Sequence, residues 1–153
     1  MEKIGKALDQ YSANTLLDKL FYFELTLFSF LTGKNDMHLK NFSMIESKSG
    51  WLLAPAYDLL NVTIINPSDK EEMALTIEGK KQQLKLEHFM RFGKGLGLTE
   101  KQLNGIFKRF LKNKQKSVKS DRPLIFIARN ESKVQRSIIG TLFKNRDILI
   151  KKV

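Results

Sequence analysis

The feature that most constrains this chain is the apolar segment from Asn14 to Thr32, which ends at Gly33. Leucine and phenylalanine occupy nearly every helical face of its C-terminal half, as expected for a helix buried inside a domain. Gly33 suits the C-terminal cap of that helix, because glycine adopts the left-handed conformation without strain. The pattern predicts a central helix around which the rest of the chain packs.

Length and composition fit one globular domain over residues 1–153. Hydrophobic residues make up 42% of the chain, which is enough to bury a core. The absence of cysteine excludes disulfides and thiolate zinc sites and suits a reducing compartment. The apolar segment contains Asp18, Lys19 and Glu24, so it is too charged to span a membrane, and no signal peptide is visible. We expect a soluble, cytoplasmic protein without membrane contact.

The net charge of +11 favours partners that carry phosphate or acidic groups. Part of this charge lies in the basic run 108–119, for which two interpretations remain open. The run could bind nucleic acid, or it could be a solvated helix face or an interface with an acidic partner. It has few interleaved aromatic residues and no recognised nucleic-acid-binding motif around it, which favours the second interpretation.

Two short apolar runs, 42–45 and 51–54, follow the central helix and are separated by a turn-rich spacer. This pattern predicts an antiparallel β-hairpin. The segment 1–9 is expected to be a short lead-in, and 73–77 a further short strand. Helices are expected over 86–92, from a capping box at Thr99 and Gln102, and after Pro123, with a lysine-rich loop or frayed helix end over 112–120.

The polar residues with chemical potential gather where the central helix ends. Asp36, His38, Lys40 and Asn41 lie within six residues, and Asp58 follows the hairpin. Asp36 can accept a proton from a hydroxyl, and the amide oxygen of Asn41 can coordinate Mg²⁺. Antiparallel pairing should bring Asp58 towards Asn41. Turn formation remains the alternative for Asp36 and Asn41, and a buried structural role the alternative for His38.

The segments GKNDMHLKNFS and APAYDLLN resemble the catalytic core of HipA-family kinases, which are the serine/threonine kinase toxins of type II toxin–antitoxin modules. The family motif reads Asp-x-His-x-Lys-Asn-Phe-Ser, followed after a hairpin by Tyr-Asp and a hydrophobic residue. The resemblance is specific over residues 14–97 and looser beyond them. It implies a mainly α (α+β) fold similar to a protein-kinase C-terminal lobe, with a small β-hairpin beside the catalytic loop.

Carried over residue by residue, the resemblance implies that Asp36 is the catalytic base of an ATP- and Mg²⁺-dependent kinase. It makes Asn41 and Asp58 the Mg²⁺ ligands, with Asp58 in the place of the DFG aspartate, and puts His38 and Lys40 near the nucleotide phosphates. It also implies a protein substrate, such as an aminoacyl-tRNA synthetase, and an antitoxin partner through which any DNA contact would be made.

The expected kinase lacks its N-terminal lobe in this sequence, because only 35 residues precede Asp36. A kinase needs a loop that covers the phosphates and a strand lysine that orients them. The glycine-rich segment 93–97 follows a predicted helix and comes too late for that role. We therefore expect little activity from the isolated chain unless a partner supplies the lobe. The alternative is a catalytically silent module that binds an antitoxin or a split-kinase partner.

Overall fold

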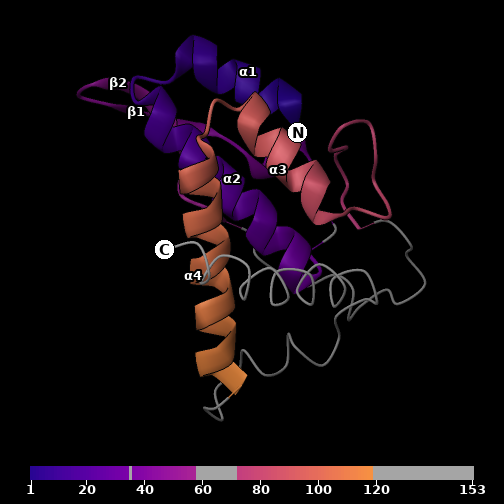
Figure 1. Ribbon diagram of the computed structural model, residues 1–153. Helices are drawn as coiled ribbons and strands as arrows, with labels where there is room; N and C mark the ends of the chain where they lie inside the picture. Colours follow the sequence, from indigo (N-terminus) through magenta and orange to yellow (C-terminus); the bar gives the residue numbers. More distant parts are fainter. Residues whose placement is uncertain (35, 58–71, 119–153) are drawn as a thin grey trace.

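The structure is a computed structural model that describes residues 1–34, 36–57 and 72–118, with only the helical backbone described over 111–118 (Figure 1). It is mainly helical with one two-stranded antiparallel sheet, as the sequence predicts. The elements in chain order are α1 (Glu2–Tyr11), α2 (Thr15–Thr32), the 3₁₀ helix η1 (Leu39–Asn41), β1 (Met44–Ser47), β2 (Gly50–Leu53), α3 (Leu86–Gly95) and α4 (Glu100–Val118).

Helix α2 is the central element, as predicted, and it runs through the middle of the described chain beside α1, α3 and α4 (Figure 1). It ends at Gly33, whose φ of 69° lies in the left-handed region. The Gly33 and Lys34 N–H groups donate to the carbonyls of Phe30 and Ser29, which satisfies the last turn of the helix. The chain therefore leaves α2 in a fixed direction.

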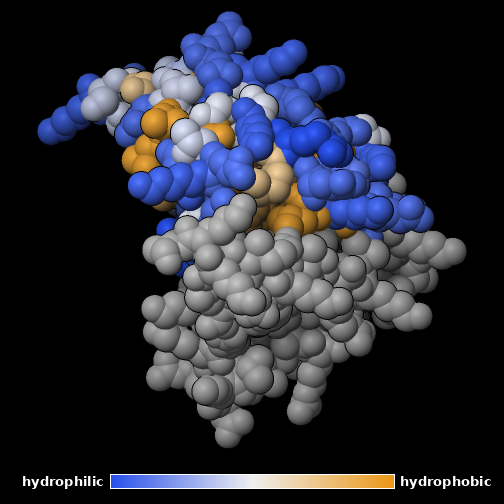
Figure 2. Space-filling view, viewed as in Figure 1, coloured by the Kyte–Doolittle hydropathy of each residue, from blue (hydrophilic) through white to orange (hydrophobic). Residues whose placement is uncertain are grey.

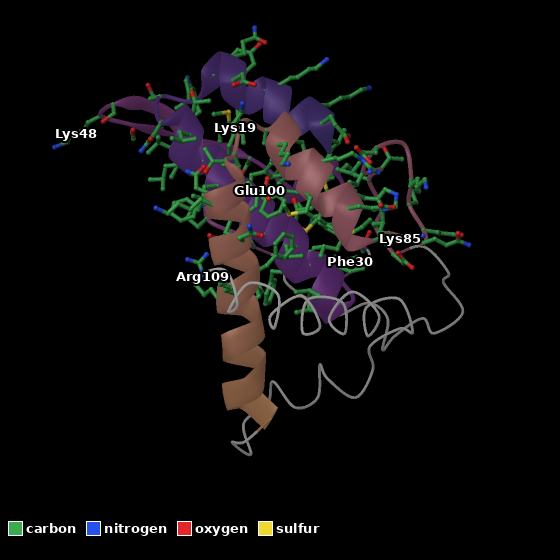
Figure 3. All side chains as sticks on the ribbon, in the orientation of Figure 1. Lys19, Phe30, Lys48, Lys85, Glu100 and Arg109 are labelled. Atoms are coloured by element: carbon green, nitrogen blue, oxygen red, sulfur yellow. The ribbon has the colours of Figure 1, made fainter. Side chains whose placement is uncertain are left out.

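Aromatic side chains from three helices form the core. Phe23 and Phe30 of α2 are fully buried, and Phe30 lies 4.9 Å from Phe89 of α3, centroid to centroid (Figure 3). Phe23 stands 6.0 Å from both Phe92 of α3 and Phe107 of α4. Burying each of these rings contributes on the order of 2–3 kcal/mol, so the three helices are held together mainly by apolar contact.

The β-hairpin is confirmed and is attached to the turn between α1 and α2. Met44 pairs with Leu53 and Ser47 with Gly50, so the turn is shorter than the predicted spacer. The Asp18 carboxylate of α2 accepts a hydrogen bond from the Leu53 N–H at 2.7 Å. The Ala13 N–H donates to the Trp51 carbonyl at 2.8 Å. These bonds fix the base of the hairpin, while Lys48 at its tip points away from the body (Figure 3).

Two local predictions are wrong. The expected lead-in 1–9 belongs to α1, an amphipathic helix that buries Ile4 and Leu8. The expected strand over 73–77 does not form, because the chain turns sharply at Glu78 and Gly79, which have φ values of 50° and 76°. Ile77 therefore makes only an isolated bridge with Lys80.

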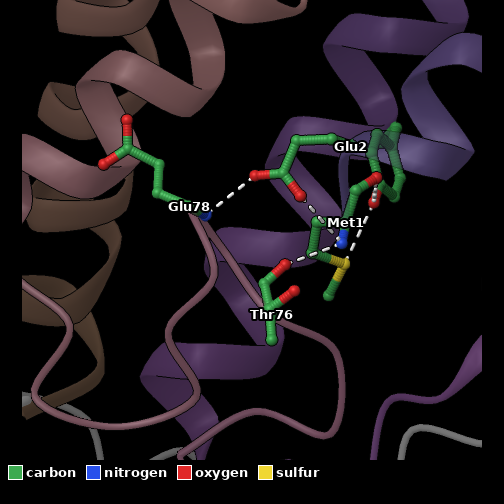
Figure 4. A network of polar contacts seen from close by, with 5 residues as sticks. Met1, Glu2, Thr76 and Glu78 are labelled. Atoms are coloured by element: carbon green, nitrogen blue, oxygen red, sulfur yellow. Dashed lines mark hydrogen bonds and ion pairs between the residues drawn. The ribbon is translucent and has the colours of Figure 1, made fainter.

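Polar contacts join α1 to the 72–85 segment (Figure 4). The Met1 ammonium donates to the Thr76 carbonyl at 2.7 Å, and the Glu78 N–H donates to the Glu2 carboxylate at 2.8 Å. The hydroxyl of Tyr22 donates to the Met1 carbonyl at 2.9 Å, and burial raises the pKa of this phenol. The start of α1 is thus anchored both to α2 and to the chain that precedes α3.

Helix α4 begins at the predicted capping box. The Gln102 N–H donates to Thr99 Oγ1 at 3.3 Å, and the Thr99 N–H donates to Gln102 Oε1 at 2.8 Å. The helix continues to Val118, so most of the predicted lysine-rich loop is helical. Arg109 forms an ion pair with Glu24 of α2, which ties α4 to the central helix. The helices predicted after Pro123 lie outside the described residues.

The described surface in Figure 2 is mostly hydrophilic, with smaller areas of hydrophobic residues. Within the described ranges, no helix is both long enough and apolar enough to cross a membrane.

Candidate functional site

The loop that follows α2 is anchored by buried residues. Met37 is 1% exposed and its sulfur lies against the hydroxyl of Ser29, in the last turns of α2. Lys34 is 2% exposed, and its backbone N–H donates to the Ser29 carbonyl at 2.9 Å. The loop that carries the predicted site is therefore packed against the end of the central helix.

Asp36 lies at the surface between these buried neighbours. Its side chain is 57% exposed, and one carboxylate oxygen lies 3.9 Å from His38 Nε2. That separation permits an ion pair when His38 is protonated but is too long for a hydrogen bond. Among the described residues no donor hydrogen-bonds the Asp36 carboxylate, so its oxygens face solvent and can accept a proton or a hydrogen bond from a ligand.

Asn41 is buried and has a fixed orientation. It is 4% exposed, and its side-chain oxygen accepts the His38 N–H at 3.0 Å, while its own N–H donates to the His38 carbonyl at 3.1 Å. The amide oxygen has two lone pairs, so one N–H bond does not prevent it from coordinating a cation. His38 Nδ1 is buried and has no hydrogen-bond partner among the residues that the structure describes. The structure thus brings Asp36, His38 and Asn41 together.

The chain returning from the hairpin runs back beside this loop. The Ala54 N–H donates to the Ser43 carbonyl at 2.9 Å, which continues the pairing beyond the strands. Further on, the Tyr57 hydroxyl donates to the carbonyl of Lys40 at 2.7 Å, while the Lys40 side chain is exposed. The residue immediately before Asp58 is therefore in contact with the loop. Asp58 itself lies outside the described residues.

Three contributors to the site escaped the sequence reasoning. Lys34 and Met37 flank Asp36 and are buried, and Tyr57 bonds the loop from the other segment. The apolar Met37 between two polar residues is a signal that this position points inward. Nothing comparable marks Lys34, since buried lysines are rare.

In the described part of the chain, no group of three or more histidine, aspartate or glutamate side chains could hold a metal ion. The predicted magnesium ligands are an amide, Asn41, and Asp58, which the structure does not describe. The magnesium prediction therefore remains a prediction.

Comparisons with known proteins agree on one family. The model of the HipA-like C-terminal domain matches residues 1–118. The chain is 38% identical over 63 residues to a Haemophilus influenzae protein named "Putative kinase", and 36% identical over 77 residues to "Putative kinase Y4mE" of Sinorhizobium fredii. These alignments cover 40% and 50% of this chain and 18% of each relative, so the chain matches less than a fifth of their length.

A solved structure has the same fold. It is a chain of the Shewanella oneidensis MR-1 complex of the toxin–antitoxin proteins HipA and HipB with operator DNA, which aligns with a TM-score of 0.64 at 23% identity. The alignment covers 89% of this chain and 32% of that one. Since the family model spans most of the sequence and the fold agrees, the chain belongs to the family of HipA-like C-terminal domains.

Proposed function

We propose that this chain is the catalytic C-terminal lobe of a HipA-type serine/threonine protein kinase in a type II toxin–antitoxin system. The observation that carries the proposal is the exposed carboxylate of Asp36 on a loop fixed by buried Met37 and Asn41. Phosphoryl transfer depends mostly on positioning and charge, and a rigid loop with an exposed base suits both needs. The substrate is a protein hydroxyl, for which an aminoacyl-tRNA synthetase is the family's precedent.

Each predicted site residue has a role in this proposal. Asp36 accepts the proton of the attacking hydroxyl, and exposed Lys40 offers a positive charge to the phosphates of ATP. Asn41 and Asp58 would hold Mg²⁺, which when bound supplies charge neutralisation. The Asn41 oxygen is of a ligand type that Mg²⁺ accepts, and the His38 N–H bond fixes its orientation. The His38 side chain is 46% exposed, so its imidazole can hydrogen-bond a ligand beside the loop.

The proposal includes the rest of the kinase. The proposed activity requires a lobe that covers the nucleotide, supplied by the same polypeptide or by a partner. An antitoxin is the second proposed partner, and DNA would be contacted through it, in the cytoplasm. The charge of +11 assists recognition of acidic or phosphate-bearing partners.

The test is phosphoryl transfer from labelled ATP to protein, measured with and without the products of the neighbouring genes. Asp36→Asn should reduce transfer by about 10²- to 10⁴-fold, because it removes the base and preserves its shape. Glu46→Gln is the control, since Glu46 is also an exposed carboxylate and no described residue pairs with its side chain. Equal activity of wild type and Asp36→Asn would show that Asp36 is not the base.

A catalytically silent interaction module is the second candidate, favoured by the net charge of +11, which attracts acidic partners whether or not the chain is catalytic. It predicts stable binding of a partner together with no phosphoryl transfer and no Mg²⁺-ATP binding under any of these conditions. Mg²⁺-ATP binding that appears only with a partner would reject it and support the kinase.

A further inference from the structure

An apolar groove lies between α1 and the loop that carries Asp36. Its volume is about 220 Å³, and α1 supplies one wall with Ala7 and Lys3. Leu39 and Phe42, three and six residues after Asp36 in the chain, contribute to the opposite wall. One end of the proposed catalytic loop is therefore also the wall of a separate hydrophobic groove.

The groove is preformed and has the size of one side chain. Ile4 and Leu8 in its lining belong to the hydrophobic core and are 9% and 1% exposed, so this part cannot collapse without disturbing the fold. An apolar cavity of roughly 150 Å³ accommodates benzene, so the groove has room for a leucine or phenylalanine side chain. Leu39, in contrast, is 56% exposed and would lose water on contact with such a side chain.

We infer that this groove receives a large apolar side chain of the protein substrate, two to four residues from the hydroxyl that is phosphorylated. A neighbouring acidic residue of the substrate then interacts with Lys3. The inference rests on the proposed function, because it takes Asp36 as the place where the hydroxyl reacts. It adds a substrate preference that the catalytic residues themselves do not specify.

The spacing follows from the chain. Leu39 is three residues from Asp36, so their Cα atoms are at most about 11 Å apart. An extended peptide advances about 3.3 Å per residue, so a substrate lying across both positions covers the gap within two to four residues. The hydroxyl and the apolar side chain therefore belong to one short substrate segment.

The charge at the groove selects an acidic neighbour. Lys3 contributes to the lining and is exposed, and the chain as a whole carries +11. No acidic residue is among those that line the groove. A carboxylate beside the apolar anchor would gain from Lys3, whereas a basic neighbour would be repelled. An apolar groove of this size with a single lysine suits a peptide better than a phosphate-rich polymer.

Peptide binding to the full chain tests the groove without requiring catalysis. Fluorescently labelled eleven-residue peptides carry a central serine in a glycine–alanine background, with one leucine scanned along both sides and a glutamate beside it. Fluorescence anisotropy should show the tightest binding with leucine two to four residues from the serine. Replacing that leucine by alanine should weaken binding by about tenfold or more, as expected for losing one buried apolar side chain.

Matched variants locate the binding site. Leu39→Ala should weaken the leucine peptide several-fold, whereas Leu16→Ala should not, although Leu16 is equally exposed at 55%. Lys3→Glu should weaken the acidic peptide, and Lys6→Glu on the same helix should do so much less. Ala7→Trp should fill the groove and abolish the leucine preference, with circular dichroism to show that the variant folds.

The outcomes separate this inference from the kinase proposal. Phosphoryl transfer that depends on Asp36 but not on leucine position or Leu39 would overturn the groove assignment and leave the kinase intact. A leucine preference lost in Leu39→Ala, together with no transfer under any condition, would reject the kinase and overturn the substrate assignment, leaving only a peptide-binding groove. Dimerisation of the wild type that Leu39→Ala disrupts would assign the groove to a second copy and overturn the substrate assignment.

Discussion

Two aspartates at opposite ends of α2 have contrasting surroundings. Asp18 is 5% exposed, and one of its oxygens accepts hydrogen bonds from Ser12 Oγ and the Leu53 N–H, both at 2.7 Å. The Asp36 side chain is 57% exposed, and its only contact among the described residues is His38 at 3.9 Å. The Asp18 carboxylate accepts hydrogen bonds from the protein's own donors. The Asp36 carboxylate accepts none among the described residues, so it can accept one from a ligand.

The geometry distinguishes a structural carboxylate, Asp18, from Asp36, whose carboxylate is exposed and available to a ligand. Asp18 connects the α1–α2 turn to β2, so its removal leaves a backbone N–H without a partner. Asp36 holds nothing in place, and the loop around it is fixed by Met37 and Asn41 instead. Replacing an exposed residue on an anchored loop changes the stability of the fold little. Such a position can therefore carry a functional residue.

Substitution of Met37 should have the largest effect on stability, because Met37 anchors the loop that follows α2 and Asp36 does not. Met37→Ala empties a fully buried position, and we expect it to lower the free energy of unfolding by about 3 kcal/mol. Met37→Leu, which keeps the volume, should cost less than about 1.5 kcal/mol. Urea denaturation measures both. Equal stabilities of Met37→Ala and wild type would show that the loop is held in another way.

Asp18 should come next. Asp18→Ala leaves the Leu53 N–H and the Ser12 hydroxyl without their acceptor, and we expect a loss of about 2 kcal/mol in urea denaturation. Asp36→Ala is the matched control and should stay within about 0.5 kcal/mol of wild type, because no donor is left unpaired. A loss of stability at Asp36 as large as that at Asp18 would show that Asp36 also has a structural role.

The sequence predicts those parts of the fold that local pattern determines. The apolar segment over 14–32 and its glycine stop indicate α2, and the two apolar runs around a polar spacer indicate the hairpin. Helix α1 was missed because its charged residues dilute a narrow apolar face that contacts the core through Ile4 and Leu8. The strand expected over 73–77 does not form, because within the described ranges this segment pairs only at Ile77, in an isolated bridge with Lys80.

For the candidate site too, the sequence predicts some features, whereas others depend on how the chain packs. Residue types and the motif identify Asp36, His38, Lys40 and Asn41, since these depend on chemistry written in the sequence. The burial of Met37, and the bond from the Tyr57 hydroxyl to the Lys40 carbonyl, depend on how distant segments pack. Such contacts cannot be read from spacing, because a single hydrogen bond leaves no periodic pattern.

Glu2 combines the exposure of Asp36 with the hydrogen bonding of Asp18. Its side chain is 48% exposed, yet it accepts the Glu78 N–H at 2.8 Å and pairs with the Met1 ammonium at 3.3 Å (Figure 4). Burial alone would raise the pKa of Glu2, but hydrogen bonds from the Glu78 and Glu2 backbone N–H groups, together with the Met1 ammonium, outweigh it and hold the pKa below its usual value. The charged form is therefore the one that stabilises the fold.

Glu2→Gln should have the smallest effect, and that effect should depend on pH. Because the folded pKa is lowered, the carboxylate contributes its full stability above the unfolded pKa of about 4.3 and loses it as pH falls through the folded value. Solvent screening at a half-exposed site limits the difference to about 0.5–1 kcal/mol at pH 7. Thermal unfolding of both proteins from pH 7 to pH 3 should show the two curves converge in acid. A gap that stays constant across this range would mean that the carboxylate's charge does not stabilise the start of α1.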